Sequence, residues 1–137
     1  MMEGLVVLGH GVDLIDVARI ERMLGEHGDR FREKVFTEIE RAYSEAGGRR
    51  RAERYAARFA AKEAAFKALG TGWRSGIAWT DAEVVHGADG APMLRVHGEF
   101  ARIADARGVT RWRLSITHTD TLAMASVLAG REPAVAG

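Results

Sequence analysis

The longest helical pattern in the sequence covers residues 50 to 69. The apolar side chains Phe59, Phe66 and Leu69 recur at helical spacing, alanines fill much of the remainder, and the stretch contains no proline. Gly70-Thr71-Gly72 follows directly, as expected for a glycine C-cap. The pattern predicts a long helix that ends at about Leu69.

The N-terminal segment from Leu5 to Asp13 is rich in Val and Leu without a helical period, so it predicts a buried strand. In a strand Gly9, Gly11 and Asp13 share one face, because side chains alternate. The two glycines leave room there for a ligand or for a close-packed segment. Asp13, at the end of this strand, is either a metal ligand or the start of the next helix. The opposite face carries Leu8, His10, Val12 and Leu14.

A second helical pattern follows Asp16, which is placed to act as its N-cap. The core-facing positions of this helix are Val17, Ile20, Leu24 and His27. Residues 29 to 35 read as a connector.

The other face of the same helix carries Arg19, Arg22 and an exposed Met23. Two interpretations stay open for this cationic face. It is either simply solvated or a docking surface for an acidic partner.

Thr37 and Glu40 have the spacing of a capping box and predict a helix that runs to about Ala46. Capping alone is sufficient to explain Glu40. Gly47-Gly48 then separates this helix from the long one.

The second half of the chain predicts four strands and one helix. Residues 122–128 are apolar on both faces, which is typical of a central strand. The other elements are strands at 77–85 and 93–97 around a turn-forming loop at 86–90, a helix at 98–107, and a strand at 111–118. The order strand, three helices, hairpin, helix and two strands indicates an α+β fold with a mostly antiparallel sheet.

Composition bounds the size and the chemistry of the protein. With 137 residues, 47% of them hydrophobic, we expect one domain over residues 1–137, with a loose tail at 131–137. The absence of cysteine excludes disulfides, thiolate metal sites and a cysteine nucleophile. The N-terminal apolar run is too short for a signal sequence, nothing approaches a membrane span, and the net charge is only +1. We therefore expect a cytoplasmic protein that binds neither membrane nor nucleic acid.

Positive charge is concentrated around the long helix. Eight of the twenty Lys and Arg residues are Arg41, Arg49, Arg50, Arg51, Arg54, Arg58, Lys62 and Lys67. On the helix Glu63 lies within about 40° of Lys67, whereas Arg58 points nearly the opposite way. A carboxylate among cations suits Mg²⁺ and a polyphosphate, although a surface pair between Glu63 and Lys67 is the simpler alternative. If Arg58 and Lys67 both bind ligands, they serve two ligands or a site completed by a second copy of the chain.

His118 ends the apolar face of the strand at 111–118. A histidine in this position is usually a hydrogen-bonded core residue. Its neighbours Thr117 and Thr119, with the amides of the following turn, would form a polar pocket suited to phosphate.

Three segments taken together resemble the holo-[acyl-carrier-protein] synthase family, the short type of 4′-phosphopantetheinyl transferase. They are Gly11-Val12-Asp13-Leu14 with Arg19-Ile20, the block from Arg58 to Gly72, and Ser115-Ile-Thr-His-Thr119. They stand in the family's order, and the resemblance covers nearly all of residues 4 to 130. It implies a 4′-phosphopantetheinyl transferase-like fold.

The resemblance also implies an activity, which is transfer of the phosphopantetheine arm of coenzyme A to a serine of apo acyl carrier protein, releasing adenosine 3′,5′-bisphosphate. It implies that Asp13 and Glu63 hold Mg²⁺ and that Lys67 contacts the pyrophosphate, with Glu63 or a water as general base. The coenzyme-binding residues it implies are Arg58, Lys67, Gly70, Thr71, Gly72, His118 and Thr119.

The family resemblance further implies a homotrimer with active sites between subunits, and an acidic carrier protein docked on Arg19, Arg22 and Met23. Carriers of fatty acid and of polyketide biosynthesis both stay open. Two other functions are compatible with the residues alone. One is an RNA-binding module on the cationic region, which lacks interleaved aromatic side chains, and the other is a Mg²⁺-dependent phosphohydrolase.

Overall fold

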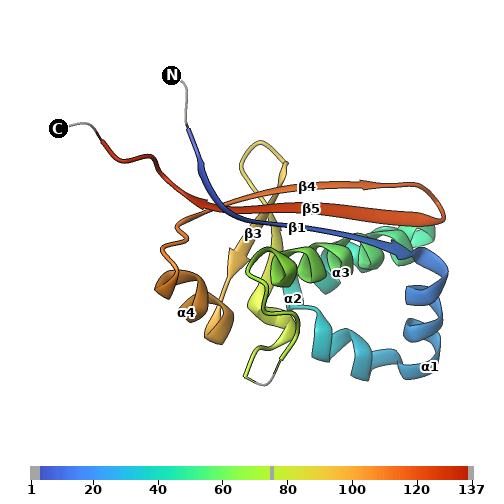
Figure 1. Ribbon diagram of the computed structural model, residues 1–137. Helices are drawn as coiled ribbons and strands as arrows, with labels where there is room; N and C mark the ends of the chain where they lie inside the picture. Colours follow the sequence, from blue (N-terminus) through green and yellow to red (C-terminus); the bar gives the residue numbers. More distant parts are fainter. Residues whose placement is uncertain (1–3, 75, 136–137) are drawn as a thin grey trace.

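A computed structural model describes residues 4–74 and 76–135 and shows a three-stranded sheet lying across one central helix, α3 (Figure 1). The elements are β1 (Val6–Asp16), α1 (Val17–Val35), α2 (Glu38–Glu45), η1 (Gly48–Arg50), α3 (Arg51–Ala68), η2 (Trp79–Asp81), β2 (Ala82–His86), β3 (Pro92–Val96), α4 (Gly98–Ala106), β4 (Arg111–His118) and β5 (Leu122–Arg131). The predicted α+β class is confirmed, and both sheets are antiparallel.

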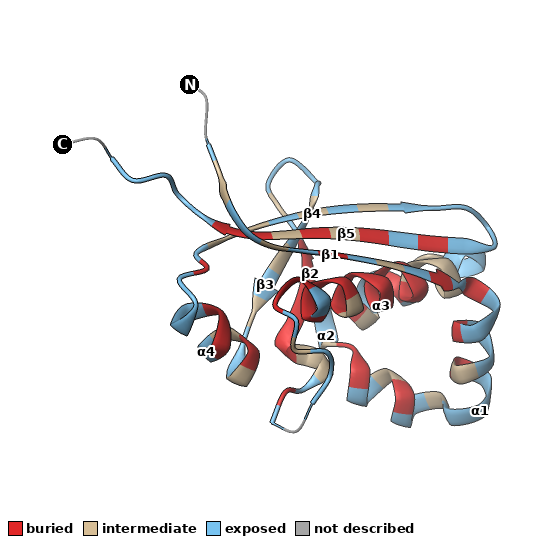
Figure 2. Cartoon of the chain, viewed as in Figure 1, coloured by how far each residue is buried: buried red, intermediate tan, exposed pale blue. Residues whose placement is uncertain are grey.

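The larger sheet has the order β1–β5–β4, so β5 is the central strand, as predicted. Its face toward α3 is buried and consists of Ala123, Ala125, Val127 and Ala129. Its other face is exposed at Leu122 and Met124, and the alternation along β5 is visible in Figure 2. An apolar strand that is covered on one face only leaves apolar surface in contact with water.

Glycine brings β1 and α3 unusually close together. A Cβ added to Gly11 would lie 1.9 Å from the carbonyl oxygen of Ala64, and one added to Gly9 would lie 1.9 Å from that of Ala68. The space on this face of β1 is therefore filled by a close-packed segment, which is α3. Asp13 follows on the same face, inside the strand and not at its end, because β1 continues to Asp16.

Several local signals at helix ends are confirmed. Thr37 and Glu40 form the full capping box of α2. The C-terminus of α3 is a Schellman motif, in which the Thr71 amide donates to the Phe66 carbonyl at 3.1 Å and Gly70 adopts a φ of 69°. Asp16 lies at the N-cap of α1, although its side chain makes no capping hydrogen bond.

The predicted connector at residues 29–35 is wrong, because α1 continues to Val35. Gly28 interrupts the helix with a φ of 51° and a ψ of −127°. Beyond this kink Phe31 and Val35 bury a new apolar stripe, while His27, expected in the first stripe, is exposed. The kink rotates the second half of the helix relative to the first. The apolar positions before and after Gly28 therefore do not follow one helical period, and the sequence pattern did not predict the second half.

The predicted strand at residues 77–85 begins later than expected. Trp79–Asp81 forms a turn of 3-10 helix, and β2 starts at Ala82. The Asp81 carboxylate accepts the Ala78 amide at 3.2 Å, and this local bond favours the turn over an extended chain.

At the C-terminus β5 extends through Arg131 and residues 132–135 have no regular structure, while residues 136–137 of the predicted loose tail lie outside the described residues. In the described part of the chain, no helix combines the length and the apolar character needed to cross a membrane.

We expect Gly11→Ala to lower the free energy of unfolding by about 3 kcal/mol, because the new methyl group would collide with the backbone of α3. Gly25→Ala is the matched control, since a Cβ at that position of α1 meets no atom within 4 Å. It should raise stability by about 0.5–1 kcal/mol, as alanine favours helix. Urea unfolding measures both changes, and a Gly11→Ala protein of unchanged stability would contradict the close packing.

Candidate active site

Asp13, Glu63 and Lys67 lie together where β1 crosses α3. Lys67 Nζ donates to Asp13 Oδ1 at 3.0 Å and to the Val12 carbonyl at 3.1 Å. Burial raises the pKa of Glu63, and the charge on Asp13 raises it further, whereas Lys67 lowers it. The structure therefore brings together the three side chains that the sequence singled out.

The two carboxylates of this cluster fit a magnesium ion. Burial is the main cause of the raised pKa of Glu63, and repulsion from Asp13 adds to it; a divalent cation between the two carboxylates would relieve that repulsion. Carboxylate oxygens are also the ligands that Mg²⁺ prefers. Within residues 4–74 and 76–135, no group of three or more His, Cys, Asp or Glu side chains could hold a metal. The remaining ligands of an ion held by Asp13 and Glu63 would therefore come from water or from a substrate.

Arg58 lies in different surroundings, between α2 and β2. Its guanidinium carbon is 4.1 Å from the centre of the Tyr43 ring, and Nη2 lies 3.3 Å from Nε2 of His86. Arg58 is buried, and its Nε has no hydrogen-bond partner among the described residues. Because the Arg58 guanidinium packs against the Tyr43 ring and the His86 ring and is not paired with a carboxylate, some of its N–H groups remain available to bind an anion.

A cavity of about 290 Å³ opens beside Arg58, and we call it the cationic pocket. Its walls include Tyr43, Arg50, Arg54, Arg58, His86 and His118. The Arg54 guanidinium also lies against the Tyr43 ring, 4.2 Å from its centre. Three guanidinium groups around one cavity suit a phosphate, which accepts several charge-assisted hydrogen bonds.

His118 borders the cationic pocket, and its Nδ1 lies 3.4 Å from Oε1 of Glu53 on α3. The turn after it differs from expectation. The Thr119 hydroxyl accepts the amides of Thr121 and Leu122 at 3.2 and 3.0 Å, so these turn amides are already bonded. Thr117 and Thr119 instead border a separate cavity of about 180 Å³ on the exposed side of the sheet, beside Leu14, Leu122 and Met124.

The remaining predicted site residues flank these two clusters. Gly70, Thr71 and Gly72 form the capped end of α3, one turn beyond Lys67. Arg19 and Arg22 are exposed on α1, and the Arg19 guanidinium lies 5.9 Å from the centre of the Phe59 ring. Met23, expected to be exposed, is partly buried against the core.

Sequence reasoning missed Tyr43 and His86, because each joins the cationic pocket from a distant part of the chain. His86 was assigned to a structural loop, yet its ring meets Arg58 across 28 residues. The helical spacing of Arg50, Arg54 and Arg58 was the available signal, since residues four apart share one face of a helix.

Burial lowers the pKa of His86, and the charges on Arg58 and Arg54 lower it further. His86 is therefore neutral at pH 7, and the folded protein loses stability as the pH falls below the ordinary value of 6.5. We expect Arg58→Met to raise the pKa of His86, measured by NMR titration of its ring. Arg102→Met on α4, which removes an exposed charge, is the control. A His86 titration that Arg58→Met leaves unchanged would show that the two groups do not interact in solution.

The chain matches the family model of the 4′-phosphopantetheinyl transferase superfamily over residues 9–125. It is 50% identical over 123 residues to the holo-[acyl-carrier-protein] synthase of Solibacter usitatus (strain Ellin6076), covering 90% of this chain and 98% of the relative. The structure is similar to the crystal structure of that synthase from Neisseria meningitidis, with a TM-score of 0.82 at 29% identity over 90% and 98% of the two chains. It is also similar to the holo-(acyl-carrier-protein) synthase from Bacillus anthracis str. Ames, solved in complex with CoA (3′,5′-ADP). The TM-score is 0.74 at 35% identity, covering 94% of this chain and 100% of that chain. The resemblance and the fold predicted from it are thus confirmed, and the chain belongs to the 4′-phosphopantetheinyl transferase superfamily, within its family of holo-[acyl-carrier-protein] synthases.

Proposed function

We propose that the protein transfers the 4′-phosphopantetheine arm of coenzyme A to a serine of apo acyl carrier protein, with Mg²⁺, and releases adenosine 3′,5′-bisphosphate. The observation that carries this proposal is the carboxylate cluster of Asp13, Glu63 and Lys67, with the cationic pocket on another side of the same helix. The carboxylate cluster suits a metal ion and a pyrophosphate, and the cationic pocket suits further phosphates. The coenzyme in the similar Bacillus anthracis structure supports the choice of substrate.

In this reaction Asp13 and Glu63 hold the ion, and Lys67 binds an oxygen of the pyrophosphate. Bound Mg²⁺ neutralises charge on phosphoryl oxygens during the transfer. Lys67 reaches the substrate because its ammonium group is at the exposed rim of the cluster, already oriented by Asp13 and by the Val12 carbonyl. The serine hydroxyl loses its proton to Glu63 or to a water as it attacks phosphorus.

The nucleotide phosphates of the coenzyme occupy the cationic pocket, where Arg58 and His118 bind them. Arg54 adds charge, and His86 gains a proton more readily once an anion offsets the neighbouring guanidinium groups. The capped end of α3 at residues 70–72 contacts the coenzyme one turn beyond Lys67, and Thr119 contacts it from the turn that follows His118.

Arg58 contacts α2 and β2, whereas Lys67 contacts β1, so the two side chains lie in different parts of the molecule. We therefore infer that a second copy of the chain completes each active site. A homotrimer would supply that copy. In support, the outer face of the sheet exposes Val12 by 43%, Leu14 by 60%, Leu122 by 39% and Met124 by 40%. Contiguous apolar surface of this kind marks an interaction site.

The acidic carrier protein docks on the α1 face formed by Arg19, Arg22 and Met23. Arg19 on this face is near enough to the carboxylate cluster for its charge to lower the pKa of Glu63. Electrostatic attraction would steer the carrier to a position where its serine meets the pyrophosphate. Carriers of fatty acid and polyketide biosynthesis both fit, and so does a cytoplasmic location.

We expect incubation with coenzyme A, Mg²⁺ and apo acyl carrier protein to add the mass of the phosphopantetheine arm to the carrier. Asp13→Asn and Glu63→Gln keep the side-chain volumes but remove the charges that hold the ion, so each should slow transfer at least about 100-fold while the fold persists. Mass spectrometry of the carrier measures transfer, and circular dichroism checks the fold. Coenzyme A hydrolysis without a carrier would indicate a phosphohydrolase, and RNA binding without coenzyme binding would indicate the other alternative.

We expect Leu14→Glu to dissociate the trimer, because it places a charge in the apolar face between copies. Ile39→Glu on α2 is the control, since Ile39 is exposed to a similar extent but lies away from the sheet. Sedimentation equilibrium gives the mass of each assembly. A wild-type protein that is monomeric and fully active would contradict the shared active site.

A further inference from the structure

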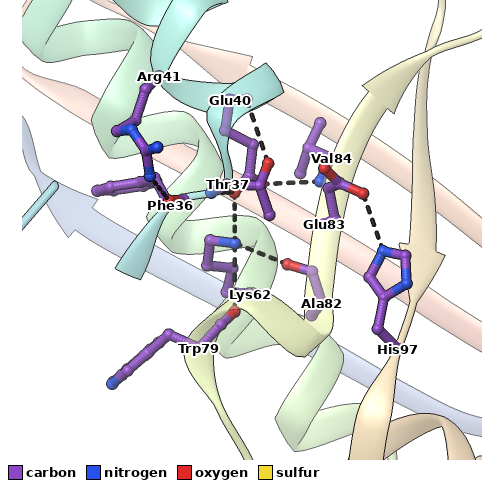
Figure 3. Close-up of polar contacts among 10 residues, drawn as sticks. All are labelled: Phe36, Thr37, Glu40, Arg41, Lys62, Trp79, Ala82, Glu83, Val84 and His97. Carbon is purple, nitrogen blue, oxygen red and sulfur yellow. Dashed lines mark hydrogen bonds and ion pairs between the residues drawn. The ribbon is translucent and has the colours of Figure 1, made fainter. Parts of the chain in front are cut away.

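Lys62 and Glu40 form an ion pair that is completely buried in the core (Figure 3). Lys62 Nζ donates to Glu40 Oε1 at 2.7 Å, to the Ala82 carbonyl at 2.8 Å and to the Trp79 carbonyl at 3.2 Å. All three protons of the ammonium group therefore have partners, which is the condition under which a buried charge is tolerated. Lys62 has no access to substrate, so the proposed reaction does not use it directly.

Glu40 does more than cap α2, which was the role that the sequence assigned to it. Its Oε1 accepts the Thr37 amide at 2.9 Å as well as Lys62, and its Oε2 accepts the Val84 amide at 2.8 Å. Both carboxylate oxygens are thus occupied (Figure 3). The pair joins three elements at one point, namely the start of α2, the middle of α3 and strand β2.

The same three elements build one wall of the cationic pocket. Tyr43 follows Glu40 by three residues on α2, Arg58 precedes Lys62 by four on α3, and His86 follows Val84 by two on β2. These spacings place each pocket residue on the same face of its element as the residue in the network. The buried network therefore lies about one helical turn, or one two-residue strand repeat, from the site where Tyr43, Arg58 and His86 meet.

Arg58 depends on that arrangement for its position. It is held between the Tyr43 ring at 4.1 Å and His86 at 3.3 Å, one on α2 and the other on β2. A change in the separation of α2 and β2 would therefore move the guanidinium. An apolar contact in place of the network would permit such sliding, whereas five directional hydrogen bonds do not.

We propose that Lys62 and Glu40 are positioning residues for the coenzyme, which hold α2, α3 and β2 at the separation where Tyr43, Arg58 and His86 form one phosphate subsite. This inference rests on the proposed function, in which the cationic pocket binds the nucleotide phosphates. The opposite side of α3 is fixed independently, by the backbone packing of Gly9 and Gly11 on β1. Loss of the pair should therefore weaken binding of the nucleotide and leave the chemical step largely intact.

The test is the paired variant Glu40→Gln/Lys62→Met, which removes both charges and keeps the side-chain volumes close to those of the native pair. Calorimetry with adenosine 3′,5′-bisphosphate gives Kd, and carrier modification gives kcat and KM for coenzyme A. We expect Kd and KM to rise by about 10-fold or more, with kcat little changed, since misplacement of a binding group by about 1 Å has effects of this size or larger.

Ile103→Ala separates positioning from simple loss of stability, because Ile103 is buried in α4 and does not line the cationic pocket. It should destabilise the fold and leave Kd unchanged. If the paired variant does not fold, Glu40→Gln alone serves, since it retains the bonds from Lys62 to Trp79 and Ala82. A folded variant of either kind with wild-type Kd overturns the inference, whereas a wild-type protein that transfers no phosphopantetheine overturns the proposed function instead.

Discussion

The close approach of β1 to α3 is the constraint on which the site depends. Gly9 and Gly11 remove two side chains from one face of the strand, and the helix backbone fills the space they leave. With the two backbones in contact, the next residue on that face, Asp13, lies within reach of Lys67 on the helix. The packing of the two backbones thus sets where Asp13 lies relative to Lys67.

The charges on α3 are distributed by what surrounds each side of the helix. Lys67 reaches the rim beside β1, Arg58 enters the cationic pocket, and Lys62 is sealed in the core. The sequence separates Arg58 from Lys67 by direction but gives no sign that Lys62 is buried. Its partner Glu40 lies on another helix, and nothing in the local pattern pairs them. Burial lowers the pKa of Lys62 and the nearby Glu40 charge opposes this, so the pair depends on both members.

The predictable features were those encoded by neighbouring residues. The capping box at Thr37 and the glycine C-cap at Gly70 are set within one helical turn, and the alternation along β5 follows from strand geometry. Features that depend on distant contacts were missed. The kink at Gly28 and the meeting of Tyr43 with His86, whose ring centres are 4.5 Å apart, follow from packing that no short window of sequence contains.

An assembly of several copies of the chain would account both for the exposed apolar face of the sheet and for the separation of the two clusters. A single chain leaves the apolar outer face of β1 and β5 in water, at Leu14 and Met124 among others. Its cationic pocket and its carboxylate cluster also lie on different sides of α3. An assembly of copies that pack through the sheet would bury the apolar face. It would also bring the two clusters together, because the cationic pocket of one copy would then lie beside Asp13 and Glu63 of the next. The same apolar pattern that makes β5 a central strand would thus also make the active site a property of the assembly.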